Sequence, residues 1–155
     1  MSQLAAGLEA PDFELKTAEG RIRRLSEELA RRPVVLVFYK ASCSTCQFAF
    51  PFIQRIYSKV GKIAPWTLWA ISEDEPQETL EFAHQHGLTF ELLIDEHPYA
   101  VSAAYGLQNV PAIFVVQKNG TISLSDFGFT KDTLNQIAGF HFFTPDDGLP
   151  SSRPG

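Results

Sequence analysis

Residues 34–46 read VVLVFYKASCSTC, a wholly apolar run followed by two cysteines. Six apolar residues in succession, Val34 to Tyr39, are typical of a central strand that is covered on both faces of a sheet. Apolar residues then recur every four positions, which predicts a helix with an apolar stripe formed by Phe48, Phe52, Ile56 and Val60. The cysteine pair therefore lies where a buried strand meets the N-terminus of a helix.

Cys43 and Cys46 are the only cysteines of the chain. A bond between residues three positions apart closes a small loop and would stabilise the fold little, so the pair is better suited to chemistry. The N-terminus of a helix favours an anion, and the thiolate is the nucleophile of disulfide exchange. Because one helical turn takes about 3.6 residues, both sulfurs lie on the same face. We therefore predict that Cys43 is an exposed nucleophile and that Cys46 is the resolving thiol.

A C-x-x-C pair can also bind metal or be inert. A structural zinc site needs about four ligands. The chain has no third cysteine, and its four histidines show no paired spacing: His84, His86, His97 and His141. The sequence thus predicts no metal site and implies no cofactor. An inert pair of buried thiols is the remaining alternative, since free cysteine is often buried.

The length of 155 residues suits one domain, which we place at residues 1–143. The remaining stretch, 144–155, consists mainly of Pro, Gly, Ser and Asp, and we expect it to be a flexible tail. The formal net charge of −5 argues against a nucleic-acid partner, which would require a basic surface.

No apolar run approaches the length of about 20 residues that a membrane-spanning helix needs. The first residues lack the basic start and the apolar stretch of a secretory signal. We therefore expect no membrane association and a cytoplasmic location, or a periplasmic one if a leader has been removed.

Strands and helices alternate along the rest of the chain. Residues 12–25 alternate polar and apolar side chains around Glu19-Gly20 and predict a hairpin. The elements predicted after the cysteine helix are a strand at 66–71, a helix at 74–86, a strand at 90–94, a helix at 97–105, a hairpin at 112–125 and a helix at 131–140. This order predicts an α/β fold in which helices cover both faces of a central mixed sheet.

Four segments carry family motifs in the expected order. They are residues 7–15 (GLEAPDFEL), 34–51 with the C-x-x-C pair, 71–95, and 105–114 (YGLQNVPAIF). Over residues 7–140 the chain resembles the thioredoxin superfamily, in particular its TlpA/ResA-like and AhpC/TSA-like branch. The resemblance implies a thioredoxin-like fold with an N-terminal β-hairpin extension and an extra strand–helix insertion.

The resemblance also implies a substrate site. The peptide bond before Pro111 should be cis and packed beside the cysteines, and the backbone of Val110 should hydrogen-bond an extended substrate strand. The implied partners are protein or low-molecular-weight disulfides and thiols, with thioredoxin or glutathione as candidate redox partners.

Three positions depart from the family pattern. Ser42 stands where the family usually has tryptophan, and Val37 and Ala49 stand where it has polar residues that assist proton transfer to the cysteines. Without such residues, a buried resolving thiol should resist ionisation. Glu73 and Asp74, at the end of a neighbouring strand, are candidates for the missing base. The alternative is that both merely cap a helix in solvent.

The leading hypothesis is a thiol–disulfide oxidoreductase. A peroxiredoxin-like thiol peroxidase is an alternative, but the Pro and Thr of its P-x-x-x-T-x-x-C motif would fall on Tyr39 and Cys43 when counted back from Cys46. In addition, no arginine lies between Ile56 and Ser152 to stabilise a peroxidatic thiolate. A non-catalytic thioredoxin-fold binding module is a third hypothesis, motivated by the missing polar helpers.

Several phenylalanines lie close to the cysteines or to the last helix. Phe50 is off the predicted stripe, and we expect it to be exposed near the cysteines as part of an apolar partner surface. Phe140, Phe142 and Phe143 could either cover the core or join a dimer interface.

Overall fold

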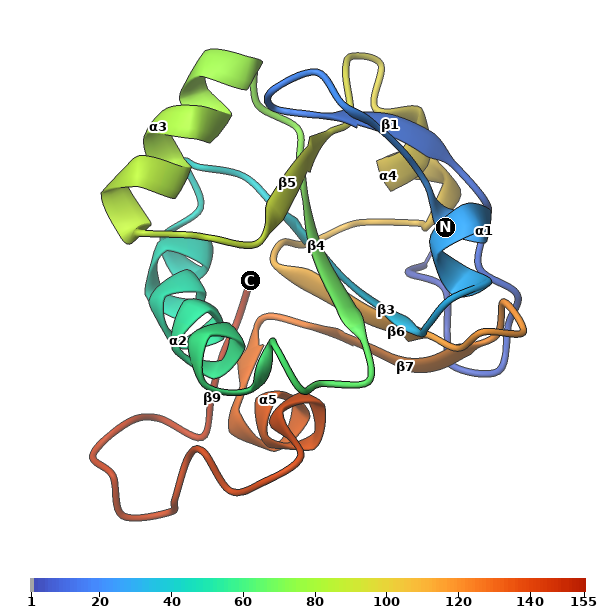
Figure 1. Ribbon diagram of the computed structural model, residues 1–155. Coiled ribbons are helices and arrows are strands. Elements are labelled where there is room, and N and C mark those ends of the chain that lie inside the picture. The colour runs from blue at the N-terminus through green and yellow to red at the C-terminus, as the bar shows by residue number, and fades with distance from the viewer. Residues whose placement is uncertain (1) are drawn as a thin grey trace.

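The computed structural model describes residues 2–155, which form an α/β fold on a seven-stranded mixed sheet (Figure 1). The strands are β1 (Glu14–Thr17), β2 (Ile22–Arg24), β3 (Val34–Tyr39), β4 (Thr67–Ser72), β5 (Glu91–Ile94), β6 (Ala112–Val116), β7 (Ile122–Phe127), β8 (Phe129–Thr130) and β9 (Ser152–Arg153). The helices are α1 (Leu25–Leu29), α2 (Ser44–Val60), α3 (Pro76–His86), α4 (Ala100–Ala104) and α5 (Lys131–Ala138). The order across the sheet is β2-β1-β5-β4-β3-β6-β7, and β8 pairs separately with β9.

β3 is the central strand, and all six of its residues are buried, as its apolar run predicts. It pairs in parallel with β4 and antiparallel with β6. Its side chains alternate between two cores, with Val35 and Val37 facing α2 and with Leu36 and Phe38 facing α1. Figure 1 shows α2 and α3 on one side of the sheet and α1 and α4 on the other. The predicted two-sided covering of the sheet is thus confirmed.

The hairpin and the insertion that the resemblance implies are both present. β1 pairs antiparallel with β2 and joins the sheet by pairing antiparallel with β5. The inserted α3 begins at Pro76 and ends before Gly87, which has the left-handed φ of 63° typical of a helix C-terminus. Within residues 2–155, no helix combines the length and the apolar character needed to cross a membrane.

The apolar face of α2 differs from the predicted stripe. Its hydrophobic residues buried against the sheet are Cys46, Ala49, Phe50, Ile53 and Ile56. Four residues advance about 40° beyond a full helical turn, so a series of four-residue steps moves off one face. Phe48 and Phe52 are accordingly only half-buried, on the flank of the helix. The prediction that Phe50 is exposed was wrong, because its ring packs against Tyr39 and Phe82 in the core.

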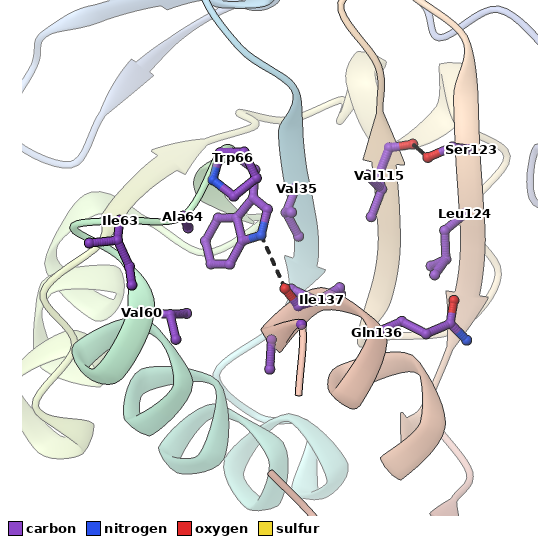
Figure 2. A pocket seen from close by; sticks show the side chains of 13 residues that line it. Val35, Val60, Ile63, Ala64, Trp66, Val115, Ser123, Leu124, Gln136 and Ile137 are labelled. Atoms are coloured by element: carbon purple, nitrogen blue, oxygen red, sulfur yellow. Dashed lines mark hydrogen bonds between the residues drawn. The ribbon is translucent and has the colours of Figure 1, made fainter. Parts of the chain in front are cut away.

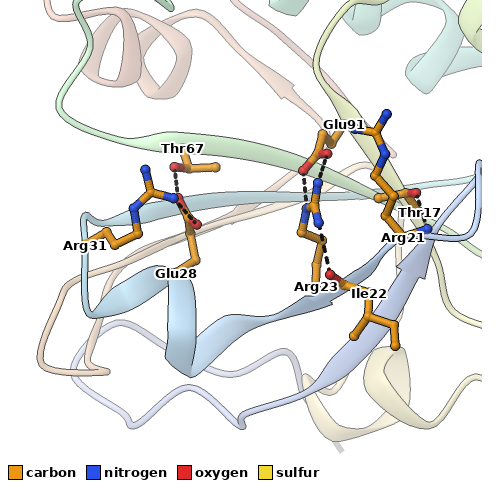
Figure 3. A network of polar contacts seen from close by, with 8 residues as sticks. All are labelled: Thr17, Arg21, Ile22, Arg23, Glu28, Arg31, Thr67 and Glu91. Atoms are coloured by element: carbon orange, nitrogen blue, oxygen red, sulfur yellow. Dashed lines mark hydrogen bonds and ion pairs between the residues drawn. The ribbon is translucent and has the colours of Figure 1, made fainter.

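A polar network attaches the N-terminal hairpin and α1 to the sheet (Figure 3). Arg23 donates two hydrogen bonds to the carboxylate of Glu91, at 2.7 and 2.6 Å, and these bonds lower the pKa of Glu91. Thr67 donates to the carboxylate of Glu28 at 2.5 Å. These contacts hold one edge of the sheet.

Residues 144–155, the predicted tail, have defined contacts in the structure. The Lys131 ammonium lies 2.5 Å from a carboxylate oxygen of Asp147, and β9 pairs antiparallel with β8. Figure 1 shows this red segment turning back beside α2. The flexibility of the segment in solution and the domain boundary at residue 143 stay predictions.

Candidate active site

Cys43 lies in the turn between β3 and α2, immediately before the first turn of the helix. Its sulfur accepts a hydrogen bond from the backbone N–H of Cys46, with an N···S distance of 3.1 Å. Its thiol donates to the carbonyl oxygen of Val110, with an S···O distance of 3.4 Å. The sulfur is therefore half-buried and lies at the N-terminus of the helix, between backbone groups of α2 and of the loop at Val110.

Cys46 is wholly buried one turn further along α2. Burial raises the pKa of its thiol far above the ordinary range, and the hydrogen bond with Cys43 raises it further. The backbone N–H of Lys40 opposes this shift only in part. Cys46 therefore holds its proton at neutral pH and needs an acceptor before it can act as a nucleophile.

The loop before β6 forms the other wall of the site. The Val110–Pro111 peptide bond is cis. The hydrogen bond from Cys43 places the Val110 carbonyl against the cysteine turn, and Gly128 donates from its backbone to the Pro111 carbonyl at 2.8 Å. The structure thus brings all four residues that the sequence singles out to the C-terminal end of β3.

The two polar helpers that the family pattern places near the cysteines are replaced by apolar residues. Val37 and Ala49 are buried in the same core cluster as Cys46. Of the two candidate bases, Glu73 forms an ion pair with the ammonium of Lys40 at 3.3 Å.

Asp74, the other candidate, reaches the cysteine turn. Its carboxylate accepts a hydrogen bond from the backbone N–H of Ala41 at 2.7 Å and one from the Ser72 hydroxyl at 3.4 Å. Its negative charge also contributes to the raised pKa of Cys46. Asp74 is therefore coupled to the buried thiol in a way that Glu73 is not.

Three features of the site are not predicted by the sequence. The Gln47 side chain donates to the Ala41 carbonyl at 2.8 Å and so braces the turn before Cys43. Thr45, between the cysteines, donates to the carbonyl of Pro154 at 2.5 Å. Tyr39 is buried at the end of β3, and its hydroxyl has no hydrogen-bond partner among residues 2–155. No local sequence signal reveals the Thr45 contact, because its partners are 109 positions apart.

An apolar cavity of about 480 Å³ lies at the other end of β3 (Figure 2). It opens between the end of α2, β6, β7 and α5, and the indole N–H of Trp66 donates there to the Ile137 carbonyl at 3.1 Å. No ionisable side chain lines it. Across residues 2–155, no three His, Cys, Asp or Glu side chains gather closely enough to hold a metal ion. The chemistry that these residues support is therefore concentrated at the cysteine pair.

Comparison with known proteins identifies the family of the chain. The AhpC/TSA family matches residues 6–125. The thiol-disulfide oxidoreductase ResA of Geobacillus thermodenitrificans is 33% identical over 135 residues, which cover 86% of this chain and 76% of that protein. The thioredoxin-like protein YneN of Bacillus subtilis is 27% identical over 133 residues, covering 84% and 76% of the two chains.

Solved structures share the whole fold. A putative protein disulfide isomerase from Bacteroides thetaiotaomicron superposes with a TM-score of 0.80 and 25% identity, covering 90% of this chain and 91% of that one. A putative thiol:disulfide interchange protein DsbE from Chlorobium tepidum superposes with a TM-score of 0.75 and 26% identity, covering 86% and 95%. The chain therefore belongs to the AhpC/TSA family, as a thioredoxin-like, ResA-like thiol–disulfide oxidoreductase with a C-x-x-C active site.

Proposed function

We propose that this chain exchanges disulfides in two steps, with Cys43 as the attacking thiol and Cys46 as the resolving thiol. The observation that carries this assignment is the difference in burial. The Cys43 sulfur is half-buried at the N-terminus of α2, whereas Cys46 is wholly buried one turn along. Only a sulfur that a partner can reach can attack the partner's disulfide first.

In the first step the Cys43 thiolate attacks one sulfur of a partner disulfide, forms a mixed disulfide and releases the other sulfur as a thiolate. In the second step Cys46 gives up its proton and attacks the Cys43 sulfur. This breaks the mixed disulfide, releases the partner as a dithiol and leaves a Cys43–Cys46 disulfide. Two electrons pass to the partner, and the same steps in reverse oxidise a partner dithiol.

The second step needs a proton acceptor because burial holds the pKa of Cys46 high. Asp74 takes this role. Its hydrogen bond to Ala41 in the cysteine turn and its electrostatic coupling to Cys46 support the assignment. Asp74 would thereby replace the polar helpers that are absent at Val37 and Ala49.

The substrate is held by the loop that contains Val110 and the cis-proline Pro111. The Val110 carbonyl lies beside the attacking sulfur, where an extended partner strand can be aligned with it. The ResA and DsbE resemblances support protein disulfides as the substrate class. Exchange with glutathione and reduction by a thioredoxin are further parts of the proposal.

Disulfide exchange is favoured over peroxide reduction by the surroundings of the attacking sulfur. Within residues 2–155, the hydrogen-bond partners of the Cys43 sulfur are the backbone carbonyl of Val110 and the backbone N–H of Cys46. A cationic side chain that could stabilise a peroxide beside the thiolate is not among them.

A redox titration tests the proposed function. The protein is equilibrated with reduced and oxidised glutathione, its free thiols are alkylated, and its mass gives the fraction that carries an intramolecular disulfide. We expect a reversible Cys43–Cys46 disulfide with a potential between about −270 and −180 mV. If no ratio of reduced to oxidised glutathione produces this disulfide in the wild-type protein, the exchange mechanism is wrong.

A further inference from the structure

The tail beyond residue 150 is attached to the segment that supports the cis-proline loop. β9 pairs antiparallel with β8, and the backbone N–H of Lys131 donates to the Ser151 carbonyl at 3.0 Å. Gly128, immediately before β8, donates to the Pro111 carbonyl at 2.8 Å. The tail therefore begins its path next to one wall of the active site.

The tail then crosses the N-terminal turns of α2. The Thr45 hydroxyl, between the two cysteines, donates to the Pro154 carbonyl at 2.5 Å. The guanidinium carbon of Arg153 lies 4.8 Å from the centre of the Phe48 ring, within the range of a cation–π contact. One polar and one aromatic contact thus hold the tail against the helix that carries the cysteines.

Gly155 lies directly against the other wall. A Cβ atom at this position would be 2.5 Å from the carbonyl oxygen of Val110, so a residue with a side chain does not fit without movement. The same carbonyl oxygen lies 3.4 Å from the Cys43 sulfur. The tail therefore reaches the place where the proposed function puts the partner strand.

We propose that residues 151–155 cover the surface between α2 and Val110 that an extended disulfide-bearing polypeptide must contact, so that the tail and the partner compete for it. This inference rests on the proposed function, and it adds a gate to the same site. The contacts of the tail also indicate what this surface accepts. It takes an extended backbone that pairs with β8, a cation over Phe48, and a residue without a side chain beside Val110.

The tail is suited to being displaced. Its ladder with β8 has two residue pairs, and residues 151–155 are exposed except for the half-buried Arg153. Segments with little buried apolar area open at low free energy. With the tail in place Cys43 is still half-exposed. A small disulfide can therefore reach its sulfur, whereas an extended polypeptide must first remove the tail.

The variant Gly155→Leu, made in the chain of residues 1–155, tests the gate, because the leucine side chain would collide with the Val110 carbonyl and displace the tail. Ser151→Ala is the matched control, because the side chain of Ser151 is exposed and forms no hydrogen bond with any part of residues 2–155. The reduced proteins are mixed with two probes: a short unstructured peptide with one glutathionylated cysteine, and glutathione disulfide. We expect Gly155→Leu to react about threefold faster or more with the peptide, and at an unchanged rate with glutathione disulfide.

Arg153→Ala, which removes the Phe48 contact, should give a smaller change in the same direction. A synthetic LPSSRPG peptide, the sequence of residues 149–155, should slow Gly155→Leu toward the wild-type rate. If wild type, Gly155→Leu and Arg153→Ala react with the peptide at equal rates, the tail is not a gate. If the rates with the peptide and with glutathione disulfide rise by the same factor, the substitution has changed the reactivity of the Cys43 thiol, and the gate is again excluded. Failure of the wild-type protein to react with either probe would instead contradict the proposed function.

Discussion

The two cysteines lie three residues apart, yet the regions around them have opposite properties. The region of Cys43 is a half-exposed turn bounded by backbone hydrogen-bonding groups and by the tail. The region of Cys46 is a core of apolar side chains from β3 and α2, and it raises the pKa of the buried thiol. In the proposed function this difference in burial is the reason why Cys43 attacks and Cys46 resolves.

Replacing each cysteine in turn by serine should have the largest effect on disulfide exchange, and the two variants should fail at different steps. Cys43→Ser should lose all reaction with a peptide disulfide, because no reachable sulfur remains. Cys46→Ser should still complete the first step and then stop at a mixed disulfide. Stopped-flow release of the first thiol, followed by intact mass, distinguishes the two variants. A Cys43→Ser protein that still forms a mixed disulfide through Cys46 would remove the basis of the comparison.

Because Cys46 is buried, the free energy of unfolding of the reduced protein should fall at alkaline pH. The thiol of Cys46 keeps its proton in the folded state, whereas an unfolded cysteine loses it near pH 8.5. This stabilisation is complete below about pH 8.5 and is lost as the pH rises, at about 1.4 kcal/mol per pH unit. Between pH 7.5 and pH 10 the free energy of unfolding should thus fall by about 2 kcal/mol.

Urea unfolding of the reduced protein across this pH range measures the loss. Cys46→Ala, although less stable at every pH, should lack this part of the slope. The buried Tyr39 and Tyr105, whose pKa values are also raised, add to the slope only above about pH 10. An identical slope in wild type and Cys46→Ala would show that Cys46 is not desolvated.

Asp74→Asn tests whether Asp74, which contacts the turn of Cys43, accepts the proton of Cys46. Asparagine keeps an oxygen for the Ala41 N–H but cannot accept a proton, so the second step should slow about tenfold or more. Alkylation of Cys43 should change much less. Glu73→Gln is the control, since it removes only the ion pair with Lys40. A slower second step that speeds up again as the pH rises, because hydroxide can then take the Cys46 proton, would support proton transfer to Asp74. Unchanged kinetics would exclude Asp74 from the role.

The smallest effect is expected far from both regions. Arg23→Ala breaks a half-exposed ion pair and should cost about 0.5–1 kcal/mol of stability at pH 7 without changing the exchange rates. Because Arg23 lowers the pKa of Glu91, this contribution is present above the ordinary pKa of a glutamate and is lost as the pH falls below it. Urea unfolding at pH 7 and pH 4 measures the difference. A changed exchange rate in this variant would mean that the hairpin reaches the active site.

Local sequence patterns predict the strand, the turn and the helix around the cysteines because each element encodes its own periodicity. The run Val34–Tyr39 is apolar at every position, and the structure places it at the centre of the sheet. Gly87 and Gly120 likewise mark a helix end and a hairpin turn, where their φ angles are positive. Phe50 was misplaced because a stripe with four-residue steps is only an approximation to a helix face.

Contacts between distant segments have no such local signal. The hydrogen bond from Thr45 to Pro154 and the approach of Gly155 to Val110 depend on the path of the whole chain. The composition of residues 144–155, rich in Pro, Gly and Ser, therefore predicts a flexible tail and gives no sign that its last residues contact the active site. The pairing of Asp74 with the cysteine turn was one of two options in the sequence, and only the fold distinguishes it from Glu73.

The division of roles between the two thiols can be tested most directly on the wild-type protein. Its reaction with a glutathionylated peptide is stopped at early times, and fragmentation mass spectrometry shows which cysteine carries the mixed disulfide. We expect the first adduct on Cys43 alone, and we expect it to decay into a Cys43–Cys46 disulfide without an adduct on Cys46. An early adduct on Cys46, or equal adducts on both sulfurs, would show that the two thiols do not divide the steps in this way.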